Sequence, residues 1–395
     1  MKWIDKKINI LLSIFKKGRI KIMKKIFSLM LVLLMFVSLS ACSSSDDTGS
    51  TGGDSTIKIG TIGPLEGDYS VYGIAVRNGA DMAIKDYNEA HGTSYTLVAY
   101  DSKGDSTEAV NAYNKLVDED GITALVGATL SGESIAVASA SQGIGTPIIS
   151  PSATAADFTL IGSNVFRGCY TDPFQAQVVA EFAHDTLGAA TAAILYETGS
   201  DYSKGLTDTF TKTFEGLGGS VVITEGYNTG DVDFNTQLTK IQSAGADVLF
   251  VPNYYKDDAL ISKQAKALNI TSTIVGGDGW DGVLSSVDNA ADVEGAIFVN
   301  HYSPDNATII ELTDRYKSTY GVDANAFAVL SYDSTTMLLE VIDEVGTDAD
   351  AIIAGIAAKK YDGVLGHMEF DANGDPIKDL SYITIKDGAY VTYTK

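Results

Sequence analysis

The stretch IKIGTIG at residues 57–63, followed by YGIAVRNGADMAIKDYNEAHG at residues 72–92, sets the pattern of the chain. The first segment is a short apolar run rich in β-branched residues, which is typical of a buried strand. The second places its apolar residues on one helical face, and these are Val76, Ala80, Ala83, Ile84 and Tyr87. Together the two segments predict a strand followed by a helix.

The same alternation continues along the chain. TLVAYDS (96–102) precedes DSTEAVNAYNKLVDEDG (105–121), in which Asp105 and Glu108 have the spacing of a helix N-cap and its N3 residue. Further strand-like runs follow, separated by helical or short connecting segments: ALVGA (124–128), PIISPS (147–152), AAILYE (192–197), SVVITEGY (220–227), VLFVPN (248–253) and STIVGGD (272–278). Strands that alternate with helices form parallel sheets with helices on both faces, so the sequence predicts the α/β class.

Polar motifs begin where these strands finish: VGATLSGES (126–134), IISPSATAAD (148–157), LYETGSDYSKG (195–205), VPNYYKDD (251–258) and GGDGWDG (276–282). Sheets of this kind bind ligands at the carboxyl ends of their strands. We therefore expect the hydroxyls, the tyrosines and one carboxylate of these motifs to gather in one place.

Catalytic and phosphate-binding interpretations of the motifs fail on their spacing. Ser131 is flanked by Thr129 and Glu133, where a hydrolase Gly-x-Ser-x-Gly frame needs glycines. None of the four histidines lies in a motif beside a strand-end carboxylate, where a base for a serine nucleophile would be expected. The chain has no Gly-x4-Gly-Lys-Ser/Thr phosphate loop, and GTIGPLEG (60–67) lacks the glycine pattern of a dinucleotide site. The sequence therefore predicts no enzyme and no cofactor.

Metal binding is not expected either. DANGDPIKD (371–379) begins like a calcium loop, but Pro376 and Tyr382 stand where that loop needs Gly and Glu. A hairpin turn is the better interpretation. The histidines and cysteines show no spacing typical of zinc ligands.

The N-terminal region has the order of a secretory signal. Lys24 and Lys25 precede an apolar run at 26–37, which is followed by Leu-Ser-Ala-Cys ending at Cys42 and by a Ser-, Asp-, Thr- and Gly-rich tract. This order predicts a signal peptide at residues 1–41, with Met23 as an alternative translation start, and a flexible linker at 42–56. A buried helix is the alternative, but the adjoining linker could not bury it. The cleavage site resembles a bacterial lipobox, which implies that Cys42 carries lipid.

Charge and cysteine content restrict the partners. The chain has a formal net charge of −23, and removal of residues 1–41, with nine basic residues and one acid, leaves −31. Such a charge repels nucleic acid and anionic lipid headgroups, so neither is an expected partner. With Cys42 lipidated, Cys169 has no intramolecular disulfide partner. The remaining ~340 residues suffice for two lobes of roughly 150–180 residues each.

Taken in order, the motifs resemble the branched-chain amino-acid (Leu/Ile/Val) receptor family of ABC transporters, which are type I periplasmic binding proteins. The resemblance is carried by GPLEGDYSVYG (63–73), VGATLSGES, IISPSATAAD, NVFRGCYTDPFQAQ (164–177), DYSKG (201–205), VPNYYKDDALISKQAKALNI (251–270), GGDGW (276–280) and AFAVLSYDS (326–334). It implies two α/β lobes, each a parallel sheet flanked by helices, joined by three crossovers and closing on a ligand. Lobe 1 would comprise residues 57–172 and 303–378, and lobe 2 residues 173–302 and 379–395.

The resemblance also implies a set of ligand-binding residues. Ser131 would bind the ligand carboxylate, and Asp278 would receive the ligand ammonium. The backbone and hydroxyl groups of Ser152-Ala153-Thr154 would hold both ligand charges. The remaining candidates are Tyr202 and Tyr254 from lobe 2, Tyr72 and Phe327 beside the side-chain pocket, and Trp280, which would either cover the ligand or belong to the lobe surface.

Elementary chemistry agrees with these roles, although each residue has a plainer interpretation. A zwitterion needs hydrogen-bond donors near its carboxylate and an acid near its ammonium, and aromatic walls suit an apolar side chain. Ser131 and Thr154 could instead cap helices, the tyrosines could be ordinary packing, and Asp278 could order a glycine turn. Arg167 and Asp333 are expected to be buried and structural.

Two departures from the family pattern bear on the ligand. Leu130 stands where the Gram-negative receptors have a disulfide cysteine, and the ammonium acceptor is Asp278 rather than their Glu, about one methylene shorter. The shorter acid could shift the ligand or admit a water.

The expected protein is thus a lipid-anchored, extracytoplasmic monomer of a Gram-positive cell. It would capture leucine, isoleucine or valine by hinge closure and present it to a membrane permease, with no chemistry done on the ligand. A ligand-binding sensor subunit, which would use the same fold and site for signalling, is the alternative.

Overall fold

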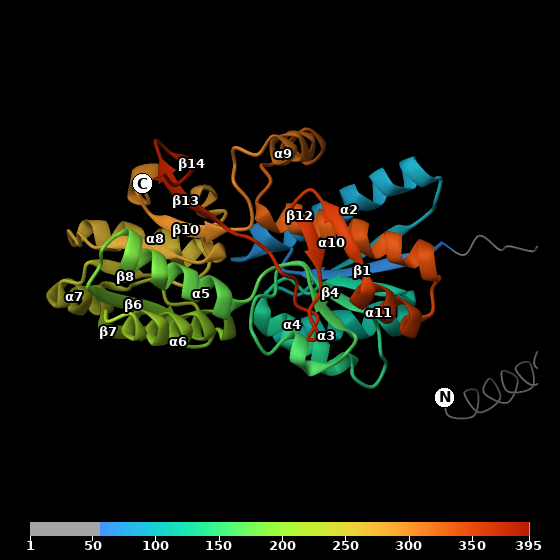
Figure 1. Cartoon of the computed structure of the whole chain (residues 1–395), viewed down its shortest axis with the longest axis horizontal. Coiled ribbons are helices and arrows are strands. Elements are labelled where there is room, and N and C mark those ends of the chain that lie inside the picture. Colours follow the sequence, from blue (N-terminus) through green and yellow to red (C-terminus); the bar gives the residue numbers. More distant parts are fainter. Residues whose placement is uncertain (1–55, 395) are drawn as a thin grey trace, which may run out of the picture. The chain divides into compact units, whose positions relative to one another are not determined.

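The computed structural model describes residues 56–394, so the predicted signal peptide, Cys42 and residues 43–55 of the linker lie outside the described residues (Figure 1). The strands in this range are β1 (Lys58–Gly63), β2 (Thr96–Asp101), β3 (Ala124–Gly127), β4 (Ile148–Ser150), β5 (Val165–Arg167), β6 (Thr191–Glu197), β7 (Ser220–Tyr227), β8 (Val248–Phe250), β9 (Thr273–Gly276), β10 (Ile297–Asn300), β11 (Lys360–Gly363), β12 (Gly366–Glu369), β13 (Ser381–Lys386) and β14 (Ala389–Thr392). The α-helices are α2 (Ser70–His91), α3 (Ser106–Lys115), α4 (Ser131–Ser141), α5 (Asp172–Glu181), α6 (Asp201–Gly216), α7 (Asn235–Ala244), α8 (Tyr255–Ala267), α9 (Ala307–Tyr320), α10 (Ala326–Val345) and α11 (Ala349–Ala358). None of these helices combines the length and the apolarity needed to cross a membrane.

Sheet A is parallel and has the strand order β2-β1-β3-β4-β5. Successive residues of its strands enter different cores, because side chains alternate across a sheet. Leu125 and Ile148 belong to the core that includes α3 and α4, whereas Val126 and Ile149 belong to the core that includes α2, α10 and α11. Figure 1 shows α2 and α10 on one side of β1 and β4 and α3 and α4 on the other.

Sheet B has the order β14-β13-β10-β9-β8-β6-β7. Its strands β6 to β10 are parallel, while β13 and β14 are antiparallel. The predicted α/β class is confirmed, but the expected fully parallel sheet is found only in sheet A. β13 pairs antiparallel with both β10 and β14. The β13/β14 pair is joined by Asp387 and Gly388, both at positive φ, and such a two-residue turn joins only antiparallel strands.

Both sheets reverse their strand order at equivalent places. In sheet A the chain goes from β1 to β2 and then to β3 on the other side of β1, and in sheet B it goes from β6 to β7 and then to β8 on the other side of β6. Ligand crevices form outside the carboxyl ends of strands at such a switch point. The pairs β1/β3 and β6/β8 therefore position the candidate site.

Three segments connect the elements around sheet A with those around sheet B. They are residues 168–171 between β5 and α5, residues 301–306 between β10 and α9, and residues 370–380 between β12 and β13. The exact lobe boundaries given above stay a prediction.

Two local predictions are confirmed. Asp105 is the N-cap of α3, where its carboxylate accepts hydrogen bonds from the backbone amides of Thr107 and Glu108. DANGDPIKD forms a turn, in which Asp371 Oδ1 accepts from two backbone amides of the same loop, at 2.8 and 3.0 Å.

Candidate functional site

A small cavity lies where the strand ends of the two sheets face each other. Sheet A and its loops contribute Thr129, Leu130, Ser131, Ser152 and Thr154. The segments after the strands of sheet B contribute Tyr202, Tyr254, Asp278 and Gly279, and Phe327 comes from α10. The space between the protein atoms here amounts to about 220 Å³ and includes open solvent.

Hydroxyl groups form the wall that sheet A contributes. Ser131 is the first residue of α4 and is buried, and its Oγ accepts a hydrogen bond from the backbone amide of Ala155 at 3.3 Å. The residue before it, Leu130, takes the cap position, so Ser131 does not cap the helix. Ser152 Oγ donates to the backbone oxygen of Thr129 at 2.8 Å. This wall offers hydroxyls and the start of a helix, which are neutral donors for a carboxylate.

Asp278 forms the opposite, acidic wall and is 2% exposed. Its Oδ1 accepts from Tyr202 Oη at 2.9 Å and from Gln175 Nε2 at 3.1 Å, and its Oδ2 lies 3.1 Å from His301 Nε2. The backbone amide of Asp278 donates to Gln175 Oε1 at 3.1 Å. Two carboxylate oxygens offer about four acceptor positions, so these three donors leave room for one more.

A second carboxyl group, that of Asp172, lies behind this wall and is fully buried. Gln175 Nε2 donates to Asp172 Oδ1 at 2.9 Å as well as to Asp278. Burial, and next the charge of Asp278, raise the pKa of Asp172 to about 8. Burial and the neighbouring carboxylate thus favour the protonated form of Asp172.

Aromatic rings surround the rest of the cavity. Tyr202 and Tyr254 stack with ring centroids 5.0 Å apart, and Tyr72 stacks on Phe327 at 4.2 Å. Tyr72 Oη donates to the backbone oxygen of Gly279 and accepts from the backbone amide of Tyr255 at 2.9 Å. Such walls favour an apolar side chain, and Tyr72 ties α2 to the segments that follow β8 and β9.

Seven of the ten predicted ligand residues line the cavity: Ser131, Ser152, Thr154, Tyr202, Tyr254, Asp278 and Phe327. Tyr72 lies one layer behind them. The structure does not bring Ala153 and Trp280 to the cavity. The Ala153 amide donates to Ser150 Oγ at 3.0 Å, and Trp280 is buried in the core with its Nε1 donating to the backbone oxygen of Val251 at 2.9 Å.

Arg167 and Asp333 are buried, as predicted, and have structural partners. Arg167 Nε lies 2.6 Å from Asp375 Oδ1, and its Nη1 donates to the backbone oxygen of Ala153 at 2.7 Å. Asp333 accepts from the backbone amides of Val364 and Leu365 at 2.9 and 2.8 Å.

Sequence reasoning missed Asp172, Gln175 and His301. His301 directly follows β10, so the strand-end rule that selected the other motifs would have indicated it. The sequence shows no motif that joins a histidine to a strand-end carboxylate, yet His301 contacts Asp278 across 23 positions of the chain. Among the described residues no hydrogen bond joins His301 to Ser131, and His301 does not line the cavity.

Comparisons with known proteins agree with this geometry. Residues 56–389 match the family described as periplasmic binding protein. The Leu/Ile/Val-binding protein BraC3 of Rhizobium johnstonii is 31% identical over 330 residues, which are 81% of this chain and 88% of the relative. The leucine-, isoleucine-, valine-, threonine- and alanine-binding protein of Pseudomonas aeruginosa is 28% identical, over 81% of this chain and 87% of the relative.

Two solved structures have the same fold. The branched-chain amino acid transporter substrate-binding protein of Streptococcus pneumoniae, in complex with isoleucine, has a TM-score of 0.80 and 29% identity and covers 86% of this chain and 99% of its own. The leucine-binding protein of Thermotoga maritima has a TM-score of 0.78 and 31% identity and covers 86% and 98%. Since the family match spans nearly all the described residues, this chain belongs to the periplasmic binding protein family.

Proposed function

We propose that this protein is the extracytoplasmic substrate-binding component of an ABC importer and captures leucine, isoleucine or valine. The observation that carries the proposal is the arrangement of charges and walls around one cavity. Asp278, still able to accept a hydrogen bond, faces the hydroxyls of Ser131 and Thr154, and aromatic rings close the remaining sides. An α-amino acid with an aliphatic side chain satisfies all three kinds of wall.

Each end of the ligand has a partner in this arrangement. The α-ammonium would bind Asp278, and the α-carboxylate would bind the hydroxyls at the start of α4. The aliphatic side chain would lie among Tyr202, Tyr254 and Phe327. Asp278 is a short acid, but Tyr202 in the cavity wall and Gln175 outside the cavity both donate to its carboxylate, which fixes the position that the ammonium must reach.

Binding would proceed by closure of the two lobes around the ligand. Tyr72 bonds Gly279 and the Tyr255 amide across the site, and these contacts can exist only when the facing strand ends are close. The ligand adds contacts to both walls, so it stabilises the closed form over the open one. No step in this cycle changes the ligand covalently.

Delivery and anchoring complete the proposal. The closed form would be presented to a membrane permease by a monomer that is tethered through lipid on Cys42, on the outer face of a Gram-positive cell membrane. The transporter relatives support transport as the output over signalling.

Calorimetric titration tests the proposed ligand. The chain from Ser43 onward, which contains the compact unit Thr56–Lys395, is stripped of ligand by unfolding and refolding and titrated with the twenty amino acids. One-to-one binding of leucine, isoleucine or valine supports the proposal. Silence across the panel, in protein that circular dichroism shows to be folded, contradicts it.

A further inference from the structure

The carboxylate that faces the ligand is contacted from behind by a histidine of a connecting segment. His301 follows β10, its ring is 1% exposed, and its Nε2 lies 3.1 Å from Asp278 Oδ2. A carboxylate accepts hydrogen bonds, so Nε2 carries the hydrogen of the neutral ring. The other ring nitrogen, Nδ1, is buried and has no hydrogen-bond partner among the described residues.

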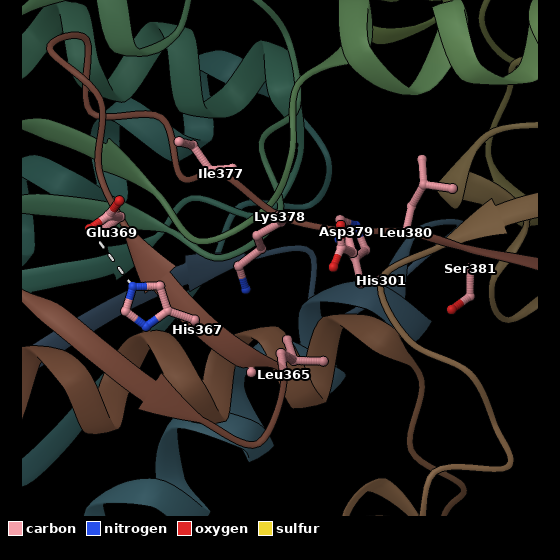
Figure 2. A pocket seen from close by; sticks show the side chains of 10 residues that line it. His301, Leu365, His367, Glu369, Ile377, Lys378, Asp379, Leu380 and Ser381 are labelled. Carbon is pink, nitrogen blue, oxygen red and sulfur yellow. Dashed lines mark ion pairs between the residues drawn. The ribbon is translucent and has the colours of Figure 1, made fainter.

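All three connecting segments meet around this ring. Tyr170, from the first segment, stacks on it with ring centroids 3.8 Å apart. On another side the ring borders a second cavity. Its lining includes His301, His367, Glu369, Lys378, Asp379 and Ser381. Figure 2 shows that the Lys378 side chain extends into this cavity between His367 and His301. His301 therefore lies between the ligand carboxylate and the segments about which the lobes would move.

We propose that His301 is a positioning residue for ligand binding, which holds the Asp278 carboxylate while its imidazole is neutral and competes with the ligand ammonium for that carboxylate once the imidazole is protonated. This inference rests on the proposed amino-acid function. It makes acidification a signal for release of the ligand.

The neutral ring and the ligand can be bound to Asp278 together. The ring donates one hydrogen bond to Oδ2, and Asp278 keeps one acceptor position for the ammonium after its contacts with Tyr202 and Gln175. A protonated ring places a full positive charge against the same carboxylate. The ammonium would then share one negative charge with a cation that is already in contact with it, so affinity falls.

The surroundings of His301 set the pH at which this happens. Burial lowers the pKa of His301, the Lys378 ammonium acts in the same direction, and Asp278 opposes both. Asp379 shares the third segment with Lys378, and His367 with Glu369 lies on β12. The phenol of Tyr170 stays neutral, because burial raises its pKa well above the ordinary value. Protonation of His301 is thus expected on the acidic side of its ordinary range. Burial also lowers the pKa of Lys378 and raises that of Asp172, and acidification favours the protonated form of both groups.

The first test compares pH profiles of leucine affinity. The ligand-stripped chain from Ser43 onward, its His301→Gln variant and its His367→Gln variant are titrated calorimetrically from about pH 7.5 to pH 5. Glutamine can donate to Asp278 but cannot gain a proton. We expect leucine to bind the unaltered chain about five- to tenfold more weakly at pH 5, His367→Gln to follow it, and His301→Gln to change less than about twofold.

The second test needs no variant. Because coupling between two sites is reciprocal, leucine must lower the titration midpoint of the His301 ring if the protonated ring weakens leucine binding. Nitrogen chemical shifts of the ring, followed against pH with and without leucine, measure this midpoint and identify the tautomer. This measurement decides the question if His301→Gln does not fold.

The outcomes separate the two proposals. Parallel affinity profiles for the unaltered chain and His301→Gln, or a midpoint that leucine does not move, would overturn the role of His301 and leave the receptor function standing. Failure of the unaltered chain to bind leucine, isoleucine or valine at any pH would overturn the proposed function and this inference with it.

Discussion

The hydroxyl oxygen of Tyr72 lies 2.9 Å from the backbone nitrogen of Tyr255 and joins α2 to the first residue of α8. Tyr72 is fully buried, so this amide has no access to water while the contact persists. When the lobes separate, water can replace the phenol. Loss of the phenol would therefore penalise the closed form, where the amide is buried, and not the open form.

Tyr72→Phe should weaken ligand binding with little effect on the fold. The ring can keep its stacking on Phe327, but the buried amide of Tyr255 loses its acceptor in the closed form. An unsatisfied buried donor costs about 1–3 kcal/mol, which corresponds to about fivefold to 150-fold weaker leucine binding by calorimetry.

Tyr320→Phe is the matched control for this change. The phenol of Tyr320 donates to Asp81 at 2.7 Å, and both residues belong to helices on the sheet A side, α9 and α2. Its loss does not touch the facing strand ends, so leucine affinity should stay within about twofold. Equal losses in both variants would contradict the closure role of Tyr72.

Asp278→Asn should abolish amino-acid binding. The substitution keeps the shape of the side chain but removes the charge that faces the ligand ammonium, and removal of one partner of a buried charge pair costs about 3–5 kcal/mol. Leucine affinity should fall by about 150-fold or more. Asp208→Asn, at an exposed position of α6, is the control and should bind like the unaltered chain. Unchanged affinity in Asp278→Asn would remove Asp278 from the site.

The pKa of Asp172 predicts a pH-dependent stability. The unfolded chain releases this proton near pH 4, whereas the folded chain holds it up to about pH 8, so the folded state binds more protons in between. Stability therefore falls as pH rises through this window, by at most about 1.4 kcal/mol per pH unit from this group.

Asp172→Asn removes that contribution, because the amide cannot ionise yet still offers an oxygen to Gln175. The thermal midpoint of the ligand-stripped variant should exceed that of the unaltered chain, and the gap should widen from about pH 5 to pH 8. Glu133, whose pKa burial raises to about 7, contributes a slope of the same sign in both proteins and cancels in the comparison. A gap that is constant with pH would mean that Asp172 is ionised throughout.

Much of the candidate site could be predicted from the rule that parallel sheets bind ligands at the carboxyl ends of their strands. The rule works because a strand end fixes where the next few residues lie. Ser131 follows β3 and Tyr254 follows β8, and both line the cavity. Side-chain direction inside a tight turn is not fixed in this way. Asp278 and Trp280 share one short turn, yet the carboxylate faces the cavity while the indole packs against Gly276 in the core.

The residues behind the site could not be found from local patterns. Gln175 reaches Asp278 across 103 positions and His301 reaches it across 23. Gln175 lies in the helix after the first connecting segment, and His301 begins the second connecting segment. The proximity of these two residues to Asp278 depends on how the two sheets are joined. The spacing of residues within either segment carries no information about that connection. The ligand roles of the cavity residues stay predictions.

The Cys169 thiol should be inert in the folded protein. Cys169 lies in the first connecting segment, is fully buried, and burial raises its pKa well above the ordinary value. The thiolate is the reactive form, so reaction requires local opening that exposes and ionises the group. In the chain from Ser43 onward, which has this cysteine alone, a disulfide reagent should label no thiol in native protein and one thiol in denaturant.

A reactive reference makes the thiol test quantitative. Cys169→Ser combined with Ser139→Cys moves the only cysteine to an exposed position of α4. The reference thiol should react at least about 100-fold faster than Cys169 at pH 8. Leucine should slow the reaction of Cys169 further and leave the reference unchanged, because a ligand that favours the closed form lowers the population of open forms. Equal rates for the two thiols would contradict the buried environment of Cys169. A leucine effect on the reference thiol but not on Cys169 would contradict the link between lobe opening and the exposure of Cys169.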